Sequence, residues 1–264
     1  MRVGLVELHV DLCGRQPACL RDAVMKDTER DAKVRAAVAD ACRQECEIVL
    51  FPGWTVVAEG VPAWLSALSK DCTLIFECVP PDQRGSKTIM KQDDDATFDG
   101  RFHVLRDGRL LLKQPARQVL AGAGQIAARG DELARELGDS GKRRWTAGSR
   151  EALLIVCGEV NVVSGGGSSR ARWDRKDLPE SDMRGGRLIL NPAHTRMAPQ
   201  AVRDKQAWLS RRGGFLLTTA NVYAGTSRSS HRAADAWTNG RRAPRSNVRA
   251  SANGHAVHVV SVPR

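Results

Sequence analysis

The 264-residue chain has few aromatic side chains, few acids in its second half and no long apolar run. It contains one Tyr and five Phe, and no apolar run approaches the roughly 20 residues that cross a membrane. Its seven Cys form no Cys-x-x-Cys pair and no zinc pattern with His. Glu7 and Asp11 near the start argue against a signal peptide. We therefore expect a cytoplasmic protein with free thiols, no metal site and no membrane anchor.

The scarcity of acids makes the second half of the chain strongly basic. Residues 1–139 include 19 basic and 22 acidic residues, whereas residues 140–264 include 22 basic and 8 acidic residues. The whole chain carries a net charge of +11. A basic surface can serve a nucleic acid, an anionic membrane or an anionic substrate. The basic residues of segment 170–176 lie among Gly, Ser and Asp and do not alternate with aromatics. This pattern favours a solvated Arg-rich surface over nucleic-acid binding.

Short apolar runs alternate with longer charged amphipathic segments, which predicts an α/β protein. The length suits one domain over residues 1–264, with no repeat or linker. The predicted strands are 3–10, 47–51, 73–79, 101–105, 109–113, 153–157, 187–191 and 215–221, with weaker ones at 234–238 and 256–262. The predicted helices are 21–45, 62–70, 131–137 and 200–212. The predicted loops are 91–100, 164–186 and 241–254.

Several predicted strands end on residues that could form a site. They are Gly53 with Trp54, Lys113, Cys157, and Asn191 followed by His194. If these strands are neighbours, their carboxyl ends form a crevice that collects a thiol, an ammonium and an amide. A nearby lysine favours a thiolate and stabilises an oxyanion, and Gly158 lets a substrate approach backbone N–H groups. On the pattern alone, Cys157 fits a small buried core residue equally well.

Segments in this order carry a resemblance to a known family. They are "MRVGLVELHV", "EIVLFPGWT", "HVLRDGRLLLKQPARQVL", "RRWTAGSREALLIVCGEVN", "GGRLILNPAHT", "RDKQAWLSRRGGFLLTTANVYAG" and "AADAWTNGR". Together they resemble the nitrilase, or carbon–nitrogen hydrolase, superfamily of amidases, nitrilases and carbamoylases. The segment "EIVLFPGWT" is similar to the family's strand ending in Phe-Pro-Glu. The segment "HVLRDGRLLLKQPARQVL" is similar to the hairpin before its catalytic Lys, and "RRWTAGSREALLIVCGEVN" is similar to the segment that reaches its nucleophile. The resemblance spans nearly the whole chain and implies an α-β-β-α sandwich.

The resemblance also implies an activity. Cys157 takes the place of the nucleophile, and Lys113 takes the place of the lysine that steadies the tetrahedral intermediate. The implied reaction is hydrolysis of a non-peptide carbon–nitrogen bond in a small amide, nitrile or carbamoyl compound through a thioester. No metal or organic cofactor is implied, and the implied assembly is a homodimer.

The sequence departs from the family where the general base is expected, because Gly53 replaces the Glu of Phe-Pro-Glu. Two explanations stay open. In the first, another carboxylate serves the site, with Glu77, Glu59 and Glu159 as candidates. In the second, the chain is a catalytically impaired relative with a binding or regulatory role, for which an anionic partner is one candidate. Glu77 lies among apolar strand residues and must be paired or functional, unless its strand is an edge strand that exposes it to water.

Four further residues are expected to line the substrate site: Trp54, Gly158, Asn191 and His194. Asn191 and His194 also have simpler roles, because Asn often fixes a turn and a lone His often makes structural hydrogen bonds. With Cys157, Lys113, Glu77 and Glu159 as the catalytic candidates, these residues make up the predicted site.

Overall fold

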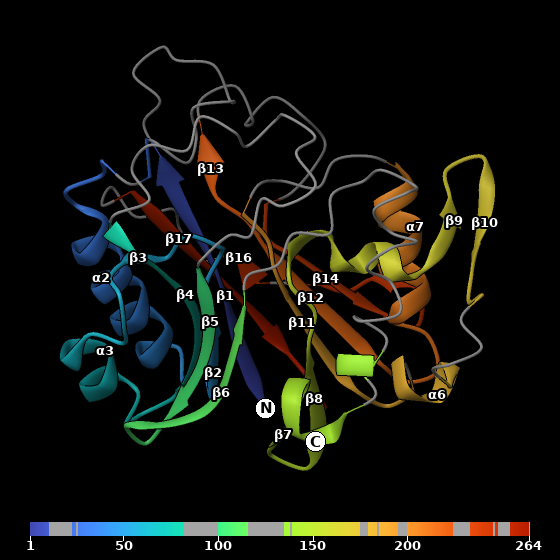
Figure 1. Cartoon of the computed structure of the whole chain (residues 1–264), viewed down its shortest axis with the longest axis horizontal. Helices are drawn as coiled ribbons and strands as arrows, with labels where there is room; N and C mark the ends of the chain where they lie inside the picture. The colour runs from blue at the N-terminus through green and yellow to red at the C-terminus, as the bar shows by residue number, and fades with distance from the viewer. Residues whose placement is uncertain are drawn as a thin grey trace.

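Two β-sheets lie face to face at the centre of the molecule, and helices cover both outer sides (Figure 1). This arrangement confirms the expected α-β-β-α sandwich. The computed structural model describes residues 1–10, 23–24, 26–81, 100–115, 135–137, 139–174, 179–183, 185–194, 200–223, 233–244, 246–247 and 254–263.

The first sheet contains nine strands within the described residues. They are β1 (Arg2–Val10), β2 (Ile48–Leu50), β3 (Val56–Val57), β4 (Thr73–Val79), β5 (Arg101–Arg106), β6 (Arg109–Pro115), β13 (Val222–Tyr223), β16 (Ser246–Asn247) and β17 (His255–Ser261). The order is β16-β17-β1-β2-β4-β5-β6, with β13 beside β1 and β3 beside β4. Strands β1, β2 and β4 run parallel, so their carboxyl ends share one edge of the sheet.

The second sheet has the order β15-β14-β12-β11-β8-β7, and its central strands β8, β11 and β12 run parallel. Its strands are β7 (Arg144–Ala147), β8 (Arg150–Leu154), β11 (Leu188–Pro192), β12 (Phe215–Thr219), β14 (Asp235–Thr238) and β15 (Arg241–Arg242). A separate two-stranded ribbon consists of β9 (Ser164–Gly166) and β10 (Ser169–Arg172).

The helices follow the apolar periodicity of the sequence. They are α2 (Arg30–Arg43), α3 (Ala63–Leu68), α5 (Ser140–Arg143), α6 (Glu180–Met183), α7 (Gln200–Leu209) and the 3₁₀ helix η3 (Cys157–Val162). Helix α2 buries Val34, Ala37, Val38 and Ala41, which recur at helical spacing on one side. That side packs on the first sheet, while α7 covers the outer face of the second.

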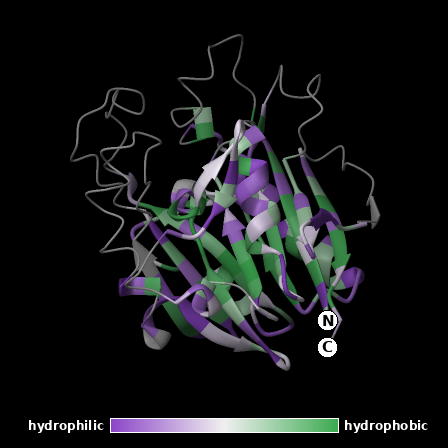
Figure 2. Ribbon diagram, turned by 90° about the vertical axis from the view of Figure 1, so that its right-hand side faces the viewer, coloured by the Kyte–Doolittle hydropathy of each residue, from purple (hydrophilic) through white to green (hydrophobic). Residues whose placement is uncertain are grey.

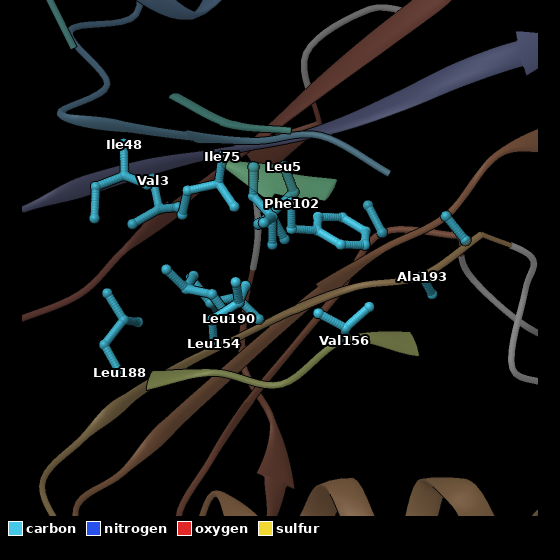
Figure 3. Packing of buried hydrophobic residues seen from close by; sticks show 14 of the residues in the cluster. Val3, Leu5, Ile48, Ile75, Phe102, Leu154, Val156, Leu188, Leu190 and Ala193 are labelled. Atoms are coloured by element: carbon cyan, nitrogen blue, oxygen red, sulfur yellow. The ribbon is translucent and has the colours of Figure 1, made fainter. Parts of the chain in front are cut away.

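Side-chain alternation along the strands produces separate apolar layers. In β1, Val3 and Leu5 face the second sheet, whereas Val6 and Leu8 face α2. Figure 2 shows strands that are mostly hydrophobic, with hydrophilic residues concentrated on helices and connections. Figure 3 shows residues of both sheets meeting in the central layer: Val3, Leu5, Ile48, Ile75 and Phe102 against Leu154, Val156, Leu188, Leu190 and Ala193.

Three predicted elements need correction. The strand expected over 153–157 ends at Leu154, and Cys157 begins η3, because side chains bind the backbone at this point, as described below. The helix expected over 21–45 is observed as α2, which begins at Arg30. The segment 164–186, expected to be a loop, contains β9, β10 and α6. Glycines with positive φ permit the turn of the β9–β10 ribbon.

Other predicted elements agree closely with the structure. Strand β4 has the predicted bounds, and β5 and β6 form the predicted Asp-Gly hairpin. Several predicted segments lie outside the described residues: 21–22, 25, 91–99, 116–120, 131–134, 175–178 and 248–253.

Within the described part of the chain, no disulfide involves Cys42, Cys46, Cys72, Cys78 or Cys157. Within the same residues, no group of three or more His, Cys, Asp or Glu is placed to hold a metal ion. No described helix combines the length and the apolar character needed to cross a membrane.

Candidate active site

Cys157 lies at a sharp bend between β8 and η3. Its φ of 42° is in the left-handed region, which is uncommon for any residue with a side chain. Such a conformation persists only where the surroundings hold it in place. Here the Asn191 side-chain amide on β11 donates to the carbonyls of Ile155, at 2.6 Å, and Cys157, at 3.2 Å. Asn191 therefore fixes the backbone of the bend, which is its simpler expected role.

Glu159 anchors the same bend from the other side. Its carboxylate accepts the Val156 N–H at 2.7 Å and two N–H groups of Arg143 at 2.9 and 3.1 Å. Arg143 is fully buried and also binds Glu136 at 2.6 Å. Burial alone would lower the pKa of Arg143, and the two carboxylates raise it. The structure thus uses Glu159 to hold the start of η3 rather than to serve the thiol.

His194 connects Cys157 to a carboxylate. Its Nε2 lies 2.8 Å from Glu77 Oε2, and its ring also hydrogen-bonds the side chain of Cys157. Because Nε2 faces Glu77, Nδ1 is the nitrogen left for the thiol. His194 and Glu77 are fully buried, and Cys157 is 7% exposed. We call Cys157, His194 and Glu77 the triad.

The triad sets the charge of its imidazole. Burial alone would lower the pKa of His194, but Glu77 and Cys157 outweigh it and raise the pKa to about 10. The imidazole is therefore protonated at neutral pH. A cation next to a cysteine favours the thiolate, which is the nucleophilic form.

Gly53 leaves the space that the His194 ring fills. A Cβ at position 53 would lie 2.3 Å from Cδ2 and 2.7 Å from Cγ of His194, much closer than any real Cβ contact. The ring is further enclosed by Trp54, with centroids 4.6 Å apart, and by Phe102, at 5.9 Å. The position where the resemblance implies a glutamate is thus filled in space by an imidazole from another part of the chain.

Glu77 is an interior residue, and the edge-strand alternative does not hold. Its strand β4 pairs with β2 on one side and β5 on the other. Besides His194, its Oε2 accepts the backbone N–H of Trp54 at 2.5 Å. The carboxylate of Glu77 therefore ties the imidazole to the turn that follows β2.

The structure does not bring Lys113 to the triad. Lys113 is exposed and lies opposite His103 in the β5–β6 pairing. The His103 ring stacks on Phe76, with ring centroids 5.5 Å apart, and Phe76 belongs to the apolar layer between the first sheet and its helices. Burial, and then Lys113, lower the pKa of His103 to about 4. Phe102, one residue earlier, faces the imidazole and pairs with Gln114. Alternation along β6 therefore points Lys113 away from the nucleophile.

Of the remaining expected residues, one lies against the imidazole, one lies in η3 and one is exposed. Trp54 is buried against the imidazole, as described. Gly158 is the second residue of η3, and the first N–H groups of a helix have no partner within it. Glu59 is exposed. His194 was expected only to line the pocket, and the sequence signal for its larger role was the pairing of a strand-end His with a Gly at position 53.

The fold is that of the carbon–nitrogen hydrolases, as the resemblance implied. No protein-family model and no curated protein sequence matches the chain. Among solved structures, the chain is similar to a Glu-to-Gln variant of the amidase from Nesterenkonia sp. AN1, with a TM-score of 0.57 and 13% identity, covering 100% of this chain and 90% of that one. That amidase, of the nitrilase superfamily, carries the acetamide moiety of fluoroacetamide covalently added at its active-site cysteine.

A glutamine-dependent NAD(+) synthetase from Cytophaga hutchinsonii is also similar, with a TM-score of 0.53 and 11% identity. The match covers 99% of this chain but only 43% of the synthetase, so the chain spans less than half of that protein. At these identities, the likeness establishes the fold.

Proposed function

We propose that the chain hydrolyses a non-peptide carbon–nitrogen bond in a small amide, nitrile or carbamoyl compound, with Cys157 as the nucleophile. The observation that carries this proposal is the buried hydrogen-bonded sequence of thiol, imidazole and carboxylate in the triad. A nucleophile beside a base that is itself oriented by a third group is the general arrangement of covalent catalysis. The fold supports the proposal, since an amidase with an active-site cysteine shares it.

In the first half of the reaction, the Cys157 thiolate attacks the carbonyl carbon of an amide. The carbonyl electrons move to oxygen, giving a tetrahedral oxyanion. The protonated His194 donates its proton to the leaving nitrogen, so that the carbon–nitrogen bond breaks and ammonia or an amine leaves. The products are a thioester on Cys157 and a neutral imidazole, which Glu77 keeps in place.

In the second half, water attacks the thioester carbon while neutral His194 takes a proton from it. The carbon–sulfur bond breaks, the carboxylic acid leaves, and the thiolate and the protonated imidazole are restored. His194 thus performs the proton transfers that the resemblance assigns to a glutamate at position 53. The oxyanion would be held by the N–H of Gly158 at the start of η3, with no contribution from Lys113.

The non-catalytic alternative predicts an empty or apolar site at Gly53 with no acid near Cys157. His194 fills the space beside Gly53 and lies within a hydrogen bond of the thiol and of the buried Glu77 carboxylate. This arrangement favours the enzyme over a binding protein that has lost its base.

The test is turnover of a panel of small amides, nitriles and carbamoyl compounds, with mass spectrometry of the chain during turnover. We expect an acyl adduct on Cys157 and a loss of about 10³-fold or more in kcat for Cys157→Ala and for His194→Gln. Cys42→Ala, which removes a thiol that is remote in sequence and only half-buried, serves as the control and should retain activity. Full activity in Cys157→Ala would contradict the proposal.

A further inference from the structure

A buried guanidinium lies behind the triad and has no assigned role. Arg30, the first residue of α2, is 2% exposed. Its Nη2 donates to the Trp54 carbonyl at 2.8 Å and to Asn221 Oδ1 at 2.6 Å, and its Nε donates to the Thr55 carbonyl at 3.2 Å. One side chain from the outer helical layer therefore binds the turn after β2 through two carbonyls and binds Asn221 through a third hydrogen bond.

Asn221 extends this contact to the imidazole. It lies between β12 and β13, where the chain passes from the second sheet to the first, and it is fully buried. Its amide donates to the Gly53 carbonyl at 2.9 Å and to the His194 carbonyl at 2.8 Å. Arg30 thus orients the amide that joins the two segments carrying Gly53 and His194.

Trp54 is clamped between Arg30 and Glu77. Its φ of 55° is in the left-handed region, which costs energy for a bulky residue. Its N–H is bound by the Glu77 carboxylate and its carbonyl by the guanidinium. The strained peptide therefore connects the carboxylate of the triad directly to Arg30.

Arg30 and Glu77 carry opposite charges, and each has one buried polar atom that makes no hydrogen bond. Burial lowers the pKa of Arg30 to about 10, while Asp27 and Glu77 act in the opposite direction, so the guanidinium is charged at neutral pH. Arg30 Nη1 and Glu77 Oε1 are both buried and lack a hydrogen-bond partner. Attraction between these opposite charges is strong in a buried setting.

We propose that Arg30 is a positioning residue for the triad. It holds the turn 53–55 and, through Asn221, the main chain of His194, so that Glu77 and the imidazole stay aligned with the thiol. This inference rests on the proposed function. The titratable and charged groups around this cluster are Asp27, Glu77, Cys157 and His194, and, on the other face of β4 to β6, Cys78, His103 and Lys113.

The test measures the rate at which iodoacetamide alkylates Cys157 as a function of pH, because only the thiolate reacts. In Arg30→Met the imidazolium is no longer aligned, and alkylation at neutral pH should fall about tenfold, with the profile shifted by about one pH unit toward that of an ordinary thiol. Arg35→Met is the matched control. Arg35 is exposed on the same helix and lies over the Trp64 ring, so its loss should leave the profile unchanged.

Two further variants keep the test decisive if Arg30→Met does not fold. Arg30→Lys retains a charge but cannot reach all three acceptors. Asn221→Ala leaves Arg30 bound to the turn but removes the amide that joins Arg30 to the carbonyls of Gly53 and His194. Both should shift the profile in the same direction as Arg30→Met, by less. Wild-type profiles in both variants, or in a folded Arg30→Met chain, would overturn the inference.

The readout separates this inference from the proposed function. If wild type itself reacts like an ordinary thiol, and His194→Gln leaves its profile unchanged, the triad assignment fails and the positioning role fails with it. If the wild-type profile depends on His194 but not on Arg30 or Asn221, only the positioning role fails.

Discussion

At the scale of single residues, the absence of a side chain at Gly53 is what admits His194 to the site. We expect Gly53→Ala to displace the imidazole, because the new Cβ would overlap its ring. A displacement of about 1 Å in a catalytic group lowers the rate by about 10²-fold, and we expect at least this loss in kcat/KM.

Gly60→Ala is the control for this substitution. Its φ is not positive, and an added Cβ at position 60 meets no atom within 4 Å. Activity should therefore be unchanged in Gly60→Ala. Wild-type activity in Gly53→Ala would show that the imidazole does not need its present position.

The raised pKa of His194 also predicts how stability depends on pH. The pKa rises from 6.5 to about 10 on folding, so the folded chain binds this proton more tightly than the unfolded chain. The associated stability is complete below pH 6.5 and is lost as the pH rises toward the folded-state value.

This dependence is best measured in Cys157→Ala, which removes the titration of the thiol while Glu77 still raises the pKa of His194. The free energy of unfolding by urea should decrease above pH 6.5, with a slope of up to about 1.4 kcal/mol per pH unit from this group. In Cys157→Ala/His194→Gln that part of the slope should disappear. Equal slopes in the two chains would show that His194 is not protonated in the folded state.

Residue chemistry made part of this site predictable. Cys157 stands out as a thiol after an apolar run, and Glu77 as an acid inside one, since a buried carboxylate needs a partner. The strand-end His and the Gly at position 53 were not enough to predict the role of His194, because that role depends on how residues after β11 meet residues after β2, which no local pattern encodes. Cys157 and Glu77 become the neighbours of His194 only when the two sheets pack together.

At the scale of elements, the bend before η3 depends on one buried ion pair. Glu159→Ala would leave Arg143 buried beside Glu136 alone and release the N–H of Val156. We expect a loss of about 1–3 kcal/mol in the free energy of unfolding, since the N–H groups of Arg143 and Val156 that Glu159 binds would be left buried without an acceptor.

The neighbouring pair of Lys142 and Asp139 is the control. Lys142 is 58% exposed, and Lys142→Ala should change stability by no more than about 1 kcal/mol. Urea denaturation of both variants measures the difference. Similar small losses in both would mean that Glu159 does not anchor the bend.

Elements with strong local patterns were predicted well, whereas an element end that depends on side chains from other segments was not. The apolar alternation of β4 and the Asp-Gly turn between β5 and β6 fix those strands locally. The run that leads to Cys157 continues as an apolar pattern beyond the end of β8, because the side chains that end the strand come from Asn191 and Glu159. Lys113 was predicted at the end of a strand and in the site, whereas β6 continues to Pro115 and one residue of register decides which side of β6 Lys113 occupies.

At the scale of the whole molecule, the layer between the sheets holds the two halves of the site together. Leu190 on β11 is fully buried in this layer, whereas Leu110 on β6 is 49% exposed. We expect Leu190→Ala to cost about 2–5 kcal/mol of stability and Leu110→Ala about 0.5 kcal/mol or less. Thermal or urea unfolding checks both, and equal losses would contradict the assignment of this layer as the core.

The basic second half has internal uses that the composition alone does not reveal. Arg143 pairs with two carboxylates, and Arg144 and Arg150 donate to main-chain carbonyls of distant segments. Arg187 binds Glu151 and the Ser181 carbonyl. These arginines tie connections to the second sheet, so part of the positive charge stabilises the fold rather than forming a surface for a polyanion.

The central claim is that Cys157 and His194 form a thiolate–imidazolium pair supported by Glu77. The most direct measurement is the ultraviolet absorbance of the thiolate, taken as the difference between wild type and Cys157→Ala across a pH titration. The account predicts a thiolate signal already present at neutral pH and lost in His194→Gln. An ordinary cysteine has a pKa of about 8.5. A thiolate signal that appears only near that pH, in both wild type and His194→Gln, would contradict the account.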